Sequence, residues 1–306
     1  MSRIIVQRLI QAAFVIVGAS LVVFLLLHYT GGDIVLSMLP DYATDEQRAE
    51  YRRKLGLDLP LPAQYANWLT SAARGDFGMS YRNDLPAMEL VLERFPATVQ
   101  LASTALGLAL LCAFPLGILA AVRRGSWWDR ACMALALVGQ SIPGFWLGLM
   151  LILVVAVELR WLPVSGREGP EYLILPALTL AAGPLAQFAR LVRSSMLEML
   201  GQDFVRTARA KGLRERSVLT GHALRAALLP LVTVIGLELG ALLNGSVVVE
   251  SVFAWPGIGR TLIAGLQQRD IPVVEAGVLL VSVLYIGINL AVDLLYATLD
   301  PRVRYR

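Results

Sequence analysis

Residues 203–230 read Asp-Phe-Val-Arg-Thr-Ala-Arg-Ala-Lys-Gly-Leu-Arg-Glu-Arg-Ser-Val-Leu-Thr-Gly-His-Ala-Leu-Arg-Ala-Ala-Leu-Leu-Pro, a basic and polar stretch between two apolar runs. Asp203 suits the N-cap of a helix, and Gly212 suits the first position beyond a helix C-terminus. The pattern predicts a helix of about two turns between these residues and a second helix that begins near Arg214.

The first of these helices carries one face that is nearly bare. Phe204, Ala208 and Gly212 follow one another at intervals of four residues, so they share one side of the helix. One large ring beside two small positions lets another surface approach closely. The sequence therefore predicts that this helix docks into a partner.

The composition is that of a membrane protein. The chain has 306 residues, of which 57% are hydrophobic, and its mean hydropathy is +0.64. These values argue against a water-soluble domain. Six apolar stretches are long enough to cross a bilayer, which predicts an all-α protein with six transmembrane helices near 9–29, 97–122, 131–157, 173–189, 226–248 and 276–297.

The charges between these stretches predict the orientation. Residues 190 to 225 carry eight basic side chains against three acidic ones, whereas residues 30 to 96 carry seven against ten. Because basic loops stay in the cytoplasm, both termini and residues 190 to 225 are expected on that side. The net charge of +4 then follows from topology, and no nucleic-acid partner is needed to explain it.

The first apolar run could be mistaken for a secretory signal, because Arg8 precedes it. The run is long and lacks a clear small-x-small cleavage site, so we expect a retained first span. Cys112 and Cys132 both lie in apolar stretches and are expected to be packing residues rather than a disulfide.

Several spans contain polar or helix-breaking residues. The third stretch carries Gln140, Ser141 and Pro143, and the fourth is expected to be short and interrupted by its prolines and a glycine. Such residues at membrane depth survive where they face protein or a water-filled path. They favour a translocation pathway, with helix packing as the alternative.

Two spans contain side chains that are costly in a bilayer. The fifth carries Glu238 and Asn244, and the sixth ends with Asp293. A carboxylate at membrane depth indicates function by default. The alternative is a structural carboxylate, hydrogen-bonded between helices or paired with a nearby arginine.

The segments on the outer side also contain short helical patterns. Residues 44–55 are expected to form a helix that starts at Thr44 and is stopped by Gly56. Residues 64–73 are expected to form another, whose aromatic face rests on the membrane surface or on a partner, or serves only as a cap. Residues 253–260 predict a compact outer loop.

The stretch 203–230 resembles the cytoplasmic EAA loop of bacterial ABC importer permeases. The general pattern is Glu-Ala-Ala, three residues, Gly, and later Ile-x-Leu-Pro. Here Arg206-Thr207-Ala208 occupies the first three positions, Gly212 the glycine, and residues 227–230 the last motif. The arginine, the threonine and the longer spacing depart from that pattern and are similar to the peptide and nickel subfamily.

Other segments, in order along the chain, resemble the first of the two permease subunits in importers of dipeptides, oligopeptides, glutathione and nickel. The resemblance covers nearly the whole chain and implies the type I, MetI-like, ABC importer permease fold. The segments are 55–58, 75–78, 94–98, 194–197, 253–260, 269–274 and 300–304.

This resemblance also implies the partners. They are a second homologous permease subunit, two ATP-binding subunits and an extracytoplasmic solute-binding protein, assembled in the lipid of the bacterial inner membrane. The chain divides into a first span with an outer region, 1–95, and a core of five spans, 96–306, with the coupling loop 190–225.

ATP and Mg would be bound by the partner ATPase subunits, and this chain is expected to bind no cofactor. The sequence agrees, because it contains no Gly-x-x-x-x-Gly-Lys-Ser/Thr loop.

By the same resemblance, the helices of residues 203–217 form the coupling element that sits in a groove of the ATPase. Its basic residues are expected to match charges on that subunit, with positive-inside anchoring as the alternative. The residues implied are Asp203, Phe204, Arg206, Thr207, Ala208, Arg209, Ala210, Lys211, Gly212, Leu213 and Glu215.

Two other classes of function fit the sequence less well. An ion-driven transporter would use Glu238 and Asp293 as relay groups, but the chain lacks a repeated half. A membrane-embedded enzyme is disfavoured because no catalytic or metal-binding motif is present. The expected cargo is a di- or oligopeptide, with glutathione or a nickel chelate as the alternatives.

Overall fold

The computed structural model describes residues 2–30, 35, 44–54 and 56–299. Within these residues every extended regular element is a helix, and β pairing is limited to an isolated bridge between Met79 and Pro86. The predicted all-α class is confirmed. Residues 300–304, one of the segments that carry the resemblance, lie outside the described residues.

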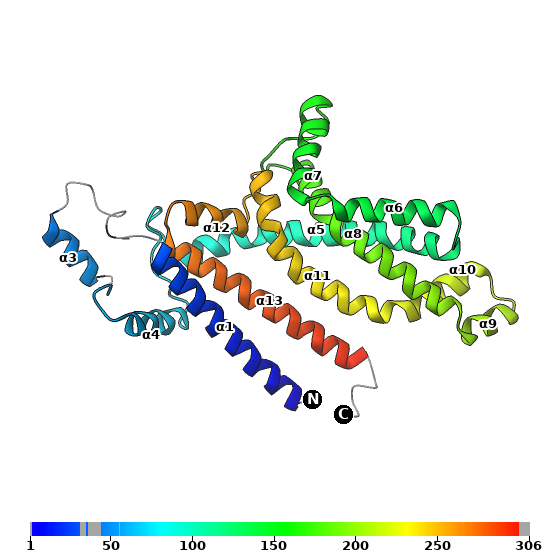
Figure 1. Cartoon of the computed structure of the whole chain (residues 1–306), viewed down its shortest axis with the longest axis horizontal. Helices are drawn as coiled ribbons and strands as arrows, with labels where there is room; N and C mark the ends of the chain where they lie inside the picture. The colour runs from blue at the N-terminus through cyan, green and yellow to red at the C-terminus, as the bar shows by residue number, and fades with distance from the viewer. Residues whose placement is uncertain (1, 31–34, 36–43, 55, 300–306) are drawn as a thin grey trace. The chain divides into compact units, whose positions relative to one another are not determined.

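The helices carry the labels of Figure 1, and two of them continue into π-helical segments, η1 and η2. In chain order they are α1 (Ser2–Thr30), α3 (Asp45–Lys54), α4 (Leu61–Ala72), α5 (Ala87–Val122), α6 (Trp127–Ser141), α7 (Gly144–Leu151), η1 (Ile152–Glu158), α8 (Glu171–Leu200), α9 (Asp203–Ala210), α10 (Glu215–Ser217), η2 (Val218–Ala223), α11 (Leu224–Val252), α12 (Ile258–Gln267) and α13 (Ile271–Leu299).

The chain forms two compact units. The first consists of Met1–Ala97 with Pro256–Ile286, and the second of Thr98–Trp255 with Gly287–Arg306. The division at residue 95 stays a prediction. The core of the first unit joins the turn after α4 to α5, α12 and α13, through Phe77, Ala87, Val91, Ile258, Val273, Ala276 and Leu279.

The start and end of α3 follow from local chemistry. The hydroxyl of Thr44 accepts a hydrogen bond from the Gln47 backbone N–H at 3.3 Å, and the Gln47 side chain accepts one from the Thr44 backbone N–H at 3.0 Å. This reciprocal pair is a capping box. Gly56 has a φ of +66°, so the expected helix and its stop at this glycine are confirmed.

The aromatic face of α4 packs on α1 of the same chain. The Tyr65 hydroxyl lies 2.8 Å from that of Ser20, and the Phe24 and Trp68 ring centroids are 6.0 Å apart. These rings contact α1, and the expectation that this face also rests on the membrane surface or on a partner stays a prediction. Packing against α1 covers part of their apolar surface within the chain.

The second unit is organised around α8, which contacts α6, α7 and α11 (Figure 1). The expectation of a short, interrupted fourth span is wrong, because α8 is a continuous helix of 30 residues. Pro176 and Pro184 lie inside it and are buried. Packing against three neighbours stabilises the helix where local propensity alone would end it.

The third expected span is broken. The α6 helix and the α7–η1 pair pass the test for a span together, yet they are bent by 99°. Ile142, between them, is extended because Pro143 follows it. The expected continuous stretch 131–157 is therefore a broken span or a re-entrant loop.

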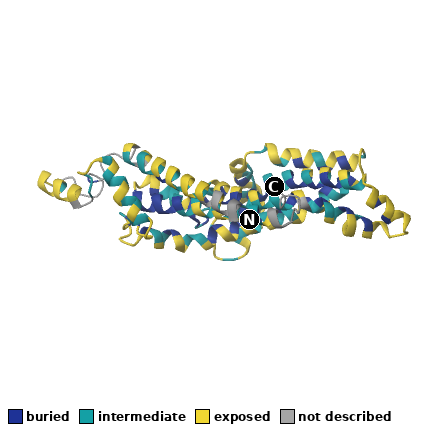
Figure 2. Ribbon diagram, turned by 90° about the horizontal axis from the view of Figure 1, so that it is seen from below, coloured by how far each residue is buried: buried dark blue, intermediate teal, exposed yellow. Residues whose placement is uncertain are grey.

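Four helices, α5, α8, α11 and α13, are long and apolar enough to cross a membrane, and the bent pair makes a fifth candidate. In α1 the corresponding apolar segment, Ile10–Leu26, is shorter. Buried and exposed faces alternate along the helices (Figure 2). Large apolar residues such as Leu111, Leu135 and Val283 are exposed, as surfaces facing lipid or another membrane chain require.

The loop expected at residues 253–260 is only partly a loop. Phe253 and Trp255 are buried in the second unit, and Ala254 takes a left-handed φ of +50° between them. Ile258 then begins α12, a helix of 10 residues that the sequence reading missed. Its apolar pattern is too short to separate from a turn by periodicity.

Candidate functional site

The short helix α9 is anchored by two side chains that face the same way. Val205 and Ala208, three residues apart, are buried, whereas the residues around them are exposed. They enter an apolar cluster that joins α5, α8, η2 and α11, here called the anchor core. Its members are Ala121, Val192, Met196, Val205, Ala208, Val218, Ala223, Ala227 and Leu231.

The end of α9 has the geometry that its sequence predicts. Gly212 has a φ of +74°, and its backbone N–H donates to the Arg209 carbonyl at 2.9 Å. The Leu213 N–H donates to the Ala208 carbonyl at 3.4 Å, which completes a Schellman motif. The second helix, α10, begins at Glu215, so the expected glycine stop and restart are confirmed.

The start of α9 differs from the prediction. Gln202 is the N-cap, without a side-chain hydrogen bond, and Asp203 is the first helical residue. Asp203 still stabilises the N-terminus through its charge. It also lies 3.3 Å from Arg206, one turn on, in a pair that is largely exposed.

The free face of α9 is not the one predicted. Phe204 is 42% exposed and Gly212 is exposed, but Ala208 is 4% exposed in the anchor core. The expected shared docking stripe of these three residues is therefore corrected, because Ala208 packs inward. The free surface instead includes Phe204, Arg206, Thr207, Ala210, Lys211, Gly212 and Leu213.

An ion pair closes the turn between α9 and α10. The Arg209 guanidinium donates to both carboxylate oxygens of Glu215, at 2.7 and 3.2 Å. This hydrogen-bonded pairing raises the pKa of Arg209 and lowers the pKa of Glu215. Arg209 is thus held across the turn, so its charge is already partly matched within the chain.

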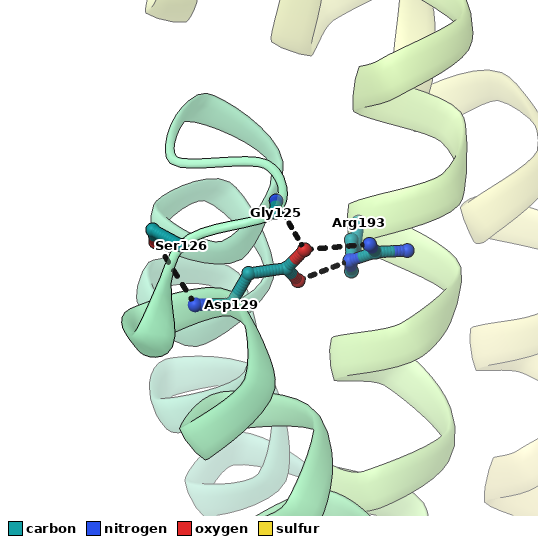
Figure 3. Close-up of polar contacts among 4 residues, drawn as sticks. All are labelled: Gly125, Ser126, Asp129 and Arg193. Atoms are coloured by element: carbon teal, nitrogen blue, oxygen red, sulfur yellow. Dashed lines mark hydrogen bonds and ion pairs between the residues drawn. The ribbon is translucent and has the colours of Figure 1, made fainter.

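A second ion pair ties the start of α6 to α8. The Arg193 guanidinium donates to both oxygens of Asp129 at 2.6 and 2.8 Å, and the Gly125 backbone N–H donates to the same carboxylate at 3.0 Å (Figure 3). Ser126 caps α6 by accepting from the Asp129 N–H. Sequence reasoning missed this role of Asp129. The Ser-x-x-Asp spacing was the signal that could have placed it at a cap.

The break between α6 and α7 opens a groove of about 330 Å³ in the second unit. Its walls come from that break, from Gly183 and Pro184 of α8, and from Gly245 of α11. Gln140 supplies a polar side chain to it. Glycine and proline leave room here where larger side chains would fill the space.

The other expected pathway residues are spread more widely. Ser141 and Pro143 line a neighbouring apolar surface, and the Ser141 hydroxyl donates to the Leu137 carbonyl at 2.8 Å. Asn244 is exposed and Glu238 is half-buried. Neither of these two lines either surface, so the structure brings Gln140 to the groove without them.

The carboxylate that is fully buried in α11 is Glu250, which the sequence reading missed. Its side chain accepts a hydrogen bond from the Thr98 hydroxyl at 2.7 Å. The expected fifth span ended at residue 248, so this carboxylate was assigned to the outer loop. The helix in fact runs to Val252.

These features define a class, a helical multi-span membrane protein with a polar helical turn anchored to its spans. The description "Binding-protein-dependent transport system inner membrane component" matches residues 113–305, and its N-terminal counterpart matches residues 1–102. The chain belongs to this family of transport system inner membrane components. It is accordingly a multi-pass inner membrane protein.

Two relatives align with all of this chain over their own full lengths. The dipeptide transport system permease protein DppB of Escherichia coli (strain K12) is 41% identical over 338 positions. The glutathione transport system permease protein GsiC of the same strain is 42% identical over 306 positions.

Solved structures agree on the fold. A chain of the inward-facing MetNI methionine ABC transporter superposes with a TM-score of 0.58 at 22% identity, covering 70% of this chain and 97% of that one. An amino acid ABC transporter with histidines gives a TM-score of 0.52 at 16% identity, covering 70% and 94%. The MetI-like fold expected from the sequence is therefore confirmed for this part of the chain.

Proposed function

We propose that the chain is the first of two permease subunits in an ATP-driven, binding-protein-dependent importer of short peptides. Its membrane domain has six spans, formed by α1, α5, the bent α6–α7 pair, α8, α11 and α13, with both termini in the cytoplasm. The basic charge of residues 190–225 and the membership of the family support this orientation.

The observation that carries the proposal is the construction of α9. Val205 and Ala208 fix the helix to the anchor core, while Phe204, Arg206, Thr207 and Lys211 stay exposed. A helix held in this way can receive a force on its free face and pass it to α5, α8 and α11. We assign it as the coupling element that docks into a partner ATPase.

The partners and their number belong to the same proposal. A second permease chain completes the pathway, and two ATP-binding subunits bind ATP and Mg. A solute-binding protein delivers cargo from outside. The chain itself contributes no ATPase site, so ATP-driven closure of the partner pair moves the α9 elements and opens the pathway outward.

The pathway is proposed to pass the break between α6 and α7. Gln140, in the groove, and Ser141 and Pro143, beside it, support this placement. Non-helical backbone at membrane depth is stable where it is buried in protein or lines a water-filled path. Glu238 and Asn244 remain candidates on α11.

A glutathione-sized peptide is the second candidate cargo, and one observation favours it. The alignment to the glutathione permease spans 306 positions, the length of this chain, whereas that to the dipeptide permease spans 338 and leaves at least 32 without a counterpart. A nickel chelate is the remaining alternative. Dipeptide and glutathione are the cargoes in the names of the relatives, and nickel comes from the subfamily that the chain resembles. A transport assay with each cargo decides among them.

The test of coupling is the substitution Gly212→Val in the complex reconstituted in proteoliposomes. A β-branched residue is strongly disfavoured at a φ of +74°, so the Schellman turn should deform. We expect at least a tenfold loss of ATPase stimulation by peptide-loaded binding protein, with normal membrane insertion.

The matched control is Gly107→Val. Gly107 lies in α5, and no atom outside the adjoining backbone of its own helix lies within 4 Å of the position that an added Cβ would take, so this change should leave stimulation within about twofold. Full stimulation in the Gly212→Val complex would sink the docking proposal.

A further inference from the structure

A pocket in the first unit has no part in the coupling or the pathway proposed above. Its volume is about 460 Å³, within the range of small-molecule sites. Its walls come from α1, the turns after α3 and α4, α4 itself, and the first turns of α13. Its lining includes Phe24, Trp68, Asp76, Phe77, Tyr81 and Glu275.

Aromatic rings form one side of this pocket. The Phe24 and Trp68 centroids are 6.0 Å apart, and Phe77 meets Trp68 edge-on at 6.4 Å. The π faces of such rings attract a cation, and indole attracts it best. An aromatic wall of this kind suits a ligand that carries positive charge.

A buried acid forms the other side. Glu275 is 5% exposed, lines the pocket, and is ion-paired with no Lys, Arg or His among the described residues. A buried carboxylate without a cation is unfavourable unless a partner arrives. Asp76 adds a second acidic side chain to the lining, and His28 is the basic side chain of the same lining.

Two further groups fit a ligand with both donors and acceptors. Burial, followed by the charges of Glu275 and Asp270, raises the pKa of Tyr81 to about 12, so its hydroxyl stays protonated. The indole N–H of Trp68 is buried beside the Glu275 carboxylate and acts on it as a donor. The pocket thus offers an acid for an ammonium group and a donor for a carbonyl.

We propose that this pocket binds a primary ammonium group, the free N-terminus of a short peptide, between Glu275 and the rings of Phe24 and Trp68. An ammonium group presents N–H donors to the carboxylate and positive charge to the rings. A metal ion fits less well, because no group of three metal-ligating side chains occurs in the described residues. The peptide as the source of the ammonium group rests on the function proposed above.

The test uses the whole complex in nanodiscs of phosphatidylcholine and phosphatidylglycerol, without the binding protein. Equilibrium binding of radiolabelled alanyl-alanine is measured with ethylamine or N-acetyl-alanyl-alanine as competitor. We expect ethylamine to displace the label and the acetylated peptide to fail. Equal competition by the acetylated peptide would overturn the proposal, and this comparison needs no variant.

Variants then locate the site. Glu275→Gln should weaken binding at least tenfold, whereas Glu89→Gln, an exposed glutamate in the first unit, should leave it unchanged. Binding by the Glu275→Gln complex at the wild-type affinity would overturn the assignment. The assignment would also be overturned if no peptide bound and the pocket instead bound added phosphatidylethanolamine in a Glu275-dependent way.

The same complex is assayed for ATP-driven peptide uptake in proteoliposomes with the binding protein. If the complex takes up peptide but shows no Glu275-dependent binding, the proposed binding site is refuted and the proposed transport function is not. Loss of uptake in the wild-type complex would instead count against the function itself.

Discussion

Asp129 is a buried carboxylate whose ion pair contributes to the stability of the fold. It is 5% exposed and holds Arg193 through two hydrogen bonds, so removing its charge leaves the guanidinium without its partner. Removing one side of such a pair costs far more than the pair itself contributes. Because Arg193 is 28% exposed, we expect Asp129→Asn to lower the free energy of unfolding by about 1–3 kcal/mol.

The measurement is thermal unfolding of the purified chain in detergent. The matched control is Asp203→Asn. In the pair of Asp203 with Arg206 the two side chains are 92% and 79% exposed. An exposed pair contributes less than about 1 kcal/mol, so this variant should unfold near the wild-type temperature. Equal shifts for the two variants would contradict the account.

The Arg209–Glu215 pair should make the stability of the turn between α9 and α10 depend on pH. Because pairing lowers the pKa of Glu215 below its ordinary 4.5, its contribution is complete above that value and is lost as the pH falls through the lowered one. Hydrogen exchange at the Gly212 and Leu213 amides, corrected for intrinsic rates, should be constant from pH 8 to 6. Glu215→Gln should lose protection already at pH 7, and a wild-type loss near neutrality would refute the assignment.

At the residue scale, the sequence predicted what depends on a few neighbours. Thr44, Gly56 and Gly212 behave as caps and stops because short-range geometry decides them. Ala208 was misplaced, because whether a small residue faces a partner or its own core depends on α5, α8 and α11. Glu250 was missed because the end of α11 was set too early.

At the element scale, α5 and α8 cross where Gly117 leaves space. A Cβ at this position would lie 2.7 Å from the Ala189 carbonyl oxygen and 2.7 Å from the Val192 Cβ. Backbone cannot yield as a flexible side chain can, so Gly117→Val should cost about 1–3 kcal/mol. The measurement is again the unfolding temperature in detergent.

Gly107 lies in the same helix and provides the control for this crossing. No atom outside the adjoining backbone of α5 lies within 4 Å of the position that its Cβ would take, so Gly107→Val should be tolerated. A similar loss in both variants would mean that helix propensity, and not the crossing, sets the cost.

Proline positions in the sequence do not show by themselves whether a helix breaks or continues. Pro143 lies between α6 and α7, where the chain bends by 99°, yet Pro176 and Pro184 leave α8 continuous. The local signal is the same in each case. The outcome differs because α8 packs against three helices, and those contacts join residues far apart in the chain.

At the scale of the whole molecule, the apolar stretches and the spaced motifs were sufficient for the class and the family. They depend on composition and on order along the chain, which the sequence states directly. The grouping of residues 256–286 with the N-terminal part was not predictable, because it rests on contacts across long separations. The aromatic pocket beside Glu275 arises from the same long-range packing.

The central claim is that this chain works as one permease subunit of an ATP-driven importer. The most direct measurement is native mass spectrometry of the complex that co-purifies with the tagged chain from its own membrane in mild detergent. We expect one copy of this chain with a second permease and two ATP-binding subunits. Recovery of the chain alone, or only with copies of itself, would contradict it.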